Sequence, residues 1–155
     1  MKDFLKLIFS VGVSLGAGVV GSLFTAPAVQ SSWYLELVKP ALNPPAWIFG
    51  PVWITLYFLM GISLWLIWKS DSKEKGRAVW LFAIQLALNA VWSPIFFGAQ
   101  SIGNALAVIV LLWAGIVLTI LVFKKISKVA AWLLVPYILW VSFAVYLNYS
   151  IWVLN

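Results

Sequence analysis

Five apolar runs dominate the sequence, each about as long as a bilayer's hydrocarbon core is thick. They cover residues 7–26, 45–68, 78–97, 105–123 and 129–154, and charged or turn-forming residues separate them. A helix needs about 20 apolar residues to cross a membrane, and no strand alternation is sustained long enough for a barrel. We therefore expect an all-α, polytopic membrane protein, with residues 1–155 forming a single integral membrane domain, a five-transmembrane-helix bundle.

The composition excludes the alternatives. The chain is 65% hydrophobic and only 9% charged, whereas soluble domains are about 45–50% apolar and about 25% charged. A soluble chain of this size could not hide that much apolar surface. Disordered chains are poor in aromatic residues and rich in charge, so disorder is excluded as well.

The residue types that are missing limit the chemistry. The sequence has no Cys and no His, and its four acidic residues all lie outside the apolar runs. Thiolate and imidazole ligands are therefore absent, and no carboxylate lies at membrane depth for ion coupling. We expect no metal site and no cofactor, although the phenols of Tyr34, Tyr57 and Tyr137 remain as potential metal ligands.

The basic residues predict the orientation. With five spans, all Lys and Arg except Lys39 fall on one side, at the amino terminus and in the loops at 69–77 and 124–128. The positive-inside rule then places the amino terminus in the cytoplasm and the carboxyl terminus outside. The basic loops are explained by topology, so we expect no nucleic-acid partner.

The first run could also be a cleaved secretory signal. Lys2 and Lys6 precede it, and Ala26-Pro27-Ala28 resembles a cleavage site. The run is longer than a usual signal core, and Gly12 and Gly16 have helix-packing spacing. We therefore expect a retained helix.

Tryptophan is unusually abundant, with 11 residues. An interfacial aromatic belt explains those near span ends, while Trp53, Trp92, Trp113 and Trp140 lie deeper. Three of these four share a helical face with neutral polar residues, and Trp113, which does not, is interpreted as packing. The three faces are Trp53, Tyr57, Met60 and Leu64; Gln85, Asn89, Trp92, Ser93 and Phe96; and Tyr137, Trp140, Ala144, Leu147 and Asn148.

These faces predict a pocket for a flat, mostly apolar ligand. The alternative is that the amides of Gln85 and Asn89 only link neighbouring helices. Pro136 should kink the fifth span. In the first loop, Asn43 is expected to cap the second span with Pro44 at its first position. This loop is rich in Pro and aromatic residues, so we expect a stiff lid over the bundle.

The first loop and two of the spans resemble the translocator protein family. The similarity rests on WY…KP…NPP in the first loop, LALNAVWSPIFFG in the third span and VPYILWVSFAVYLNYSIW in the fifth. This family includes bacterial tryptophan-rich sensory proteins and the mitochondrial peripheral benzodiazepine receptor. The similarity extends over nearly the whole chain.

The resemblance implies a five-helix bundle that binds porphyrins, sterol-like molecules and benzodiazepine-type ligands in a pocket under the first loop. Some bacterial members degrade protoporphyrin in light, and the two tryptophans implicated there correspond to Trp53 and Trp140. The other family pocket positions correspond to Tyr34, Pro44, Tyr57, Asn89, Trp92, Ser93, Ala144 and Leu147. Gln85 and Tyr137 join the candidate ligand-binding set because of their helical faces.

One departure from the family concerns sterols. Animal members carry a cholesterol motif that needs a basic residue soon after a Tyr late in the fifth span. No basic residue follows Tyr149, and the motif is itself a weak pattern. Whether sterols bind at that position is therefore left open, and a bacterial context is favoured.

Three functions remain open. The chain is a membrane receptor, sensor or carrier for porphyrins or other hydrophobic small molecules, an enzyme that degrades porphyrin with light and oxygen through Trp53 and Trp140, or a scaffold without a ligand. The third span also presents small residues opposite its polar face, which predicts a homodimer through Ala83, Ala87 and Ala90. The competing seam is the Gly12 and Gly16 face.

Overall fold

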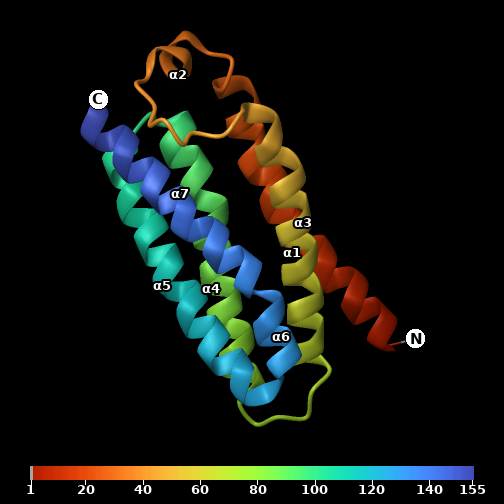
Figure 1. Ribbon diagram of the computed structural model, residues 1–155. Coiled ribbons are helices and arrows are strands. Elements are labelled where there is room, and N and C mark those ends of the chain that lie inside the picture. Colours follow the sequence, from red (N-terminus) through yellow and green to blue (C-terminus); the bar gives the residue numbers. More distant parts are fainter. Residues whose placement is uncertain (1) are drawn as a thin grey trace.

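The computed structural model describes residues 2–155 and shows an all-α architecture in which those residues form no strand. Eight helical segments follow one another along the chain (Figure 1). They are α1 (Lys2–Ala28), α2 (Ser32–Glu36), α3 (Ala46–Trp68), α4 (Lys75–Ser93), the π-helical η1 (Pro94–Gly98), α5 (Ile102–Ile126), α6 (Lys128–Leu133) and α7 (Val135–Leu154).

Five of the helical stretches are long and apolar enough to cross a membrane. They are Asp3–Ala28, Ala46–Trp68, Lys75–Gly98, Ile102–Ile126 and Lys128–Leu154. The structure thus confirms the polytopic helical class, and the helices extend some of the apolar runs by a few residues because the flanking polar residues complete their terminal turns.

Two prolines interrupt the regular helices. Proline lacks an N–H and clashes with the carbonyl four residues earlier. At Pro94 the chain continues as a π-helical turn, in which the Ala99 N–H donates to the Pro94 carbonyl at 2.8 Å. Near Pro136 the fifth span divides into α6 and α7, which agrees with the predicted kink. The π-turn had no counterpart in the sequence prediction.

The expected helix cap at Asn43 is wrong. α3 begins at Ala46, its N-cap residue is Pro45, and no side chain caps it. The Asn43 amide instead donates to the carbonyl of Pro44 at 3.3 Å. The two consecutive prolines keep the chain extended past Asn43, because the residue before a proline is disfavoured in helical geometry.

The five spans form a closed ring with the order α3, α1, α4, α5 and α7. Phe82 of α4 stacks on Phe123 of α5 with centroids 6.1 Å apart. α6 closes the ring against α3, where the Ser63 hydroxyl donates to the Ala130 carbonyl at 2.7 Å. α3 and α7 meet least closely, so the ring is weakest along that seam.

The two ends of the bundle differ in character. The loop carrying α2 lies at the end where the chain finishes, while the α3–α4 loop and the α5–α6 corner lie at the other end with the amino terminus (Figure 1). Aromatic contacts anchor the α2 loop. The ring centroids of Trp33 and Phe96 are 6.0 Å apart, and those of Tyr34 and Phe97 are 5.6 Å apart. The Val38 N–H donates to Asn155 Oδ1 at 3.0 Å. This loop therefore covers one end of the helices.

A close approach of the α1 and α3 backbones gives a first prediction, the replacement of Gly61 by Ala. A Cβ at Gly61 would lie 2.5 Å from Val11 Cα, which is backbone and cannot move aside alone. Overpacking of this kind costs about 1–3 kcal/mol. We expect Gly61→Ala to lower the thermal unfolding midpoint in detergent, whereas Gly12→Ala, whose Cβ meets nothing within 4 Å, serves as the matched control. Equal midpoints for the two variants would contradict this packing.

Candidate ligand-binding interior

A chain of hydrogen bonds between buried side chains links three spans at the centre of the bundle. The Tyr57 hydroxyl of α3 donates to Asn89 Oδ1 of α4 at 2.5 Å. Asn89 Nδ2 donates to the Tyr137 hydroxyl of α7 at 2.9 Å, and that hydroxyl donates to Gln85 Oε1 at 2.9 Å. All four side chains are buried. Residues that the helical faces singled out are therefore brought together, and the amides do link neighbouring helices.

Aromatic rings cover this network on the side of the α2 loop. Trp53 stacks on Tyr57 with centroids 5.4 Å apart and meets Tyr137 edge-on at 6.3 Å. Trp140, one turn along α7 from Tyr137, packs edge-on against Phe49 at 5.8 Å. Trp53 and Trp140 are both half-buried. The two candidate tryptophans thus belong to one aromatic layer between the network and the α2 loop.

Two buried donors in this region have no hydrogen-bond partner among residues 2–155. They are Nε1 of Trp140 and Nε2 of Gln85. An unpaired buried donor loses its hydration without compensation, at a cost of about 1–3 kcal/mol. The interior therefore contains hydrogen-bonding capacity that an acceptor from outside the chain can satisfy.

Trp92 takes part in a second network. Its indole N–H donates to Asn148 Oδ1 at 3.0 Å, and Asn148 Nδ2 donates to the Ile102 carbonyl at 3.0 Å. The Trp92 ring stacks on Phe96 with centroids 5.1 Å apart. Leu147, beside Asn148 on α7, is buried, while Ala144 is half-buried against the main core. This group lies between α4, α7 and the start of α5.

Ser93 contacts a different helix. Its hydroxyl accepts a hydrogen bond from Thr25 Oγ1 of α1 at 3.3 Å, and a Cβ at Gly21 would lie 3.3 Å from Ser93 Oγ. The structure therefore places Ser93 at the α1–α4 contact. Trp113, interpreted as packing, has a polar partner, because its indole N–H donates to Ser142 Oγ at 2.8 Å.

The α2 loop contributes Tyr34 and Pro44. The Lys39 ammonium donates to the Tyr34 carbonyl and lies 4.4 Å from the centroid of the Tyr34 ring. Burial raises the pKa of the Tyr34 phenol above its ordinary value. Pro44 is half-buried. Both residues belong to the loop that closes the end of the bundle, as the lid interpretation requires.

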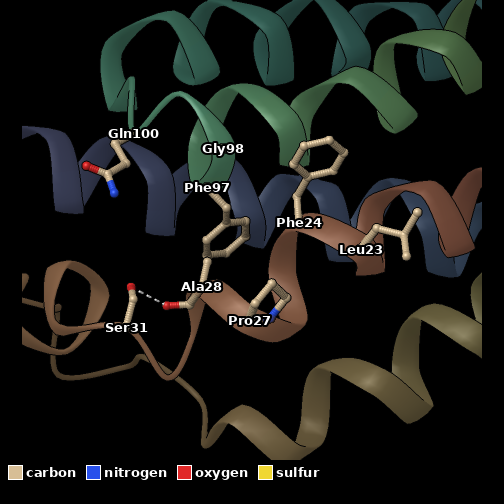
Figure 2. Close-up of a pocket in the computed structure, with 8 residues that line it drawn as sticks. All are labelled: Leu23, Phe24, Pro27, Ala28, Ser31, Phe97, Gly98 and Gln100. Carbon is tan, nitrogen blue, oxygen red and sulfur yellow. Dashed lines mark hydrogen bonds between the residues drawn. The ribbon is translucent and has the colours of Figure 1, made fainter.

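Two open hollows lie outside this interior. One, of about 290 Å³, is formed by the end of α1 together with η1, and Figure 2 shows the rings of Phe24 and Phe97 on its walls. The other, of about 280 Å³, lies along the α3–α7 seam and is lined by residues that include Pro51 and Pro136. Neither includes a predicted ligand-binding residue. The only sequence signal for them is the prolines, which locally prevent regular helix packing.

Among residues 2–155, no group of three or more acidic side chains could hold a metal ion. The interior offers phenol, amide and indole groups, all of them neutral. Its chemistry is therefore aromatic stacking, apolar burial and hydrogen bonding.

These features define a multi-pass helical membrane protein with an aromatic-lined, hydrogen-bonded interior closed by a loop. The model of the TspO/MBR family matches residues 10–153, and the chain belongs to this family. It is 50% identical to the tryptophan-rich protein TspO of Chlorobaculum tepidum, over 99% of this chain and 98% of that protein.

Similarity extends to animal and other bacterial proteins. The translocator protein of Homo sapiens is 42% identical, with 93% of this chain and 86% of that protein covered. The tryptophan-rich sensory protein of Cereibacter sphaeroides is 37% identical, with 79% and 77% covered. The family assignment made from the loop and span motifs is therefore confirmed, and the protein is an integral, multi-pass membrane protein.

The buried network gives a second prediction, for Asn89→Leu. The change leaves the buried Tyr57 hydroxyl without its acceptor, at a cost of about 1–3 kcal/mol. The Tyr137 hydroxyl loses the Asn89 donor but keeps its bond to Gln85 Oε1. We expect a clear loss of stability in detergent unfolding. Thr55→Val is the control, because Thr55 Oγ1 bonds only within its own helix, to the Pro51 carbonyl. An Asn89→Leu variant as stable as the control would show that the network is not a major stabilising contact.

Proposed function

We propose that this protein is a membrane receptor or carrier that binds porphyrins and similar flat hydrophobic molecules beneath the α2 loop. The observation that supports this most directly is the aromatic layer of Trp53 and Trp140 above a polar network with unpaired donors. Flat conjugated ligands gain from stacking on such rings, and peripheral acceptor oxygens can pair with the spare N–H groups. The relatives named as translocator and sensory proteins favour transport or sensing.

Binding in this region requires side chains to move. Tyr57, Asn89 and Tyr137 are buried against one another, so a porphyrin cannot simply fill an empty space there. The α2 loop and the α3–α7 seam are the parts of the enclosure with the fewest contacts to displace. We therefore propose that the ligand displaces the aromatic layer and leaves the network beneath it in place.

A second candidate function is photochemical degradation of the bound porphyrin. Trp53 stacks on Tyr57 and lies edge-on to Tyr137, so an electron-rich cluster would face an excited porphyrin. The interior has no conventional base at pH 7, and the chemistry would depend on light, oxygen and donation from Trp53 or Trp140. This function uses the same site, and it would be detected as loss of porphyrin absorbance that depends on light and on the protein.

The third prediction concerns these two tryptophans. Protoporphyrin IX is titrated into purified protein in darkness, with Trp fluorescence and porphyrin absorbance as readouts. Trp53→Phe and Trp140→Phe keep most of the stacking area, so we expect binding to weaken by no more than about tenfold. Under light and oxygen, both variants should bleach porphyrin more slowly than the wild type if the second function applies.

Trp113→Phe is the matched control, because Trp113 is exposed and bonds to Ser142. Absence of saturable quenching in the wild-type protein would contradict the binding function. Wild-type bleaching rates in both variants would contradict the donor role.

We also propose that the protein forms a homodimer through α4, with its amino terminus in the cytoplasm of a bacterial cell. Ala83 and Ala87 are exposed on α4, and Ala90 is half-buried. Small residues allow the close backbone approach that favours helix association in membranes. The basic loops lie together at one end of the bundle, which supports the orientation through the positive-inside rule.

A fourth prediction tests the dimer with Ala87→Leu. The larger side chain should separate the two α4 helices and shift the detergent-solubilised protein from dimer to monomer in light scattering, while leaving porphyrin binding intact. Gly16→Leu, on the exposed face of α1, tests the competing seam. A dimer that survives Ala83→Leu combined with Ala87→Leu would place the interface elsewhere.

A further inference from the structure

Three exposed lysines lie together where α5 meets α6. Lys124 and Lys125 end α5, and Lys128 begins α6 after the single extended residue Ser127. The Ser127 side chain accepts from the Ala130 N–H and fixes the start of α6. Three exposed lysines therefore lie within five residues at one corner of the bundle.

The chain provides no carboxylate for these lysines. Glu74 is the last acidic residue in the sequence, and it lies 3.9 Å from Arg77, while Asp3 lies 3.5 Å from Lys6. Among the side chains of residues 3–155, those are the only ion pairs within 4.0 Å. The lysines at the α5–α6 corner are therefore a cationic surface that the chain itself leaves uncompensated.

The lysines of the neighbouring loop are occupied differently. The Lys75 ammonium donates to the Ser70 carbonyl at 2.7 Å, and the Lys69 ammonium lies 4.1 Å from the Trp65 ring centroid. One charge is thus held by the α3–α4 loop and the other by the end of α3. The two groups of basic residues at this end of the bundle are thus chemically distinct, although both satisfy the positive-inside rule.

Large apolar side chains surround the α5–α6 corner. On α6, Trp132 and Val129 are 71% and 63% exposed, and Trp80 near the start of α4 is 71% exposed. Tryptophan prefers the headgroup level of a bilayer. The exposed tryptophans therefore favour a position of this corner at the depth of the lipid phosphates, with the lysines directed toward the aqueous phase.

We propose that the α5–α6 corner, defined as Lys124, Lys125, Lys128 and Trp132, binds the headgroup of an anionic membrane lipid. The lysines pair with the phosphate, and Trp132 packs against the glycerol and upper acyl region. Charge complementarity and membrane depth together favour a lipid over a soluble phosphate. This interaction is independent of the porphyrin site, which lies toward the opposite end of the bundle.

The test counts lipids that stay bound to the purified protein. Delipidated protein in detergent is titrated with phosphatidylglycerol or with phosphatidylcholine of the same chains, and native mass spectrometry measures occupancy. The wild type should retain phosphatidylglycerol preferentially. In the triple variant Lys124→Gln, Lys125→Gln and Lys128→Gln, the ratio of bound phosphatidylglycerol to bound phosphatidylcholine should fall by about tenfold. Each basic residue near a membrane surface adds to the attraction for anionic lipid.

The matched control is the triple variant Lys69→Gln, Lys73→Gln and Lys75→Gln, which removes the same charge from the adjacent loop. It should retain the preference. Equal loss of the preference in both triple variants would show that only net charge matters and would overturn the proposal. An unchanged preference in the variant of the α5–α6 corner would overturn it as well. If that triple variant does not fold, Lys125→Gln alone must still lower occupancy while Lys73→Gln does not.

A second readout does not depend on charge removal. Brominated phosphatidylglycerol and phosphatidylcholine quench Trp fluorescence on contact, and the signal lost in Trp132→Phe reports the contribution of Trp132. We expect the anionic lipid to quench the Trp132 fluorescence more strongly than phosphatidylcholine does. Millimolar glycerol phosphate should not reduce this quenching. Equal quenching by both lipids, or displacement by glycerol phosphate, would overturn the lipid assignment.

Discussion

The fold depends on the rule that a polar group within a membrane must find its partner inside the protein. Tyr57, Asn89 and Tyr137 meet this rule together, because each belongs to a different span and forms its hydrogen bond with a residue of another span. Apolar burial does not drive helices together in lipid. The network therefore fixes the relative rotation of α3, α4 and α7, and this rotation turns Trp53 and Trp140 toward the core of the bundle.

The π-helical turn at Pro94 positions aromatic side chains that contact the α2 loop. A regular helix through Pro94 would carry Phe96 and Phe97 in a different direction, whereas the π-turn directs them toward Trp33 and Tyr34 of the loop region. π-helical turns are frequent at functional sites. The loop is thus held by aromatic contacts at one side and, through Val38, by the Asn155 amide at another.

Much of this arrangement could be predicted from the sequence, because membrane helices obey simple length and periodicity rules. Run length located the spans, and a 100° step brought Tyr57, Asn89 and Tyr137 to interior faces. The same step could not predict that the Ser93 hydroxyl, on the polar face of α4, accepts a hydrogen bond from Thr25 of α1. Which neighbour a residue meets, and where prolines leave hollows or change the helix type, depends on packing among all five spans and is not encoded in the periodicity of one.

A closed, hydrogen-bonded interior also determines what kind of ligand the proposed site would select. A ligand there exchanges contacts, since it must replace the stacking of Trp53 on Tyr57 and of Phe49 against Trp140. A flexible apolar chain loses conformational freedom on entry and offers no stacking face. A rigid planar molecule replaces each aromatic contact at little entropic cost, and acceptor oxygens at its edge satisfy the indole N–H of Trp140 that the chain leaves unpaired. Under the proposed function, selectivity for flat ligands with peripheral acceptors would follow from the contacts that must be replaced and would not need a preformed cavity of matching shape.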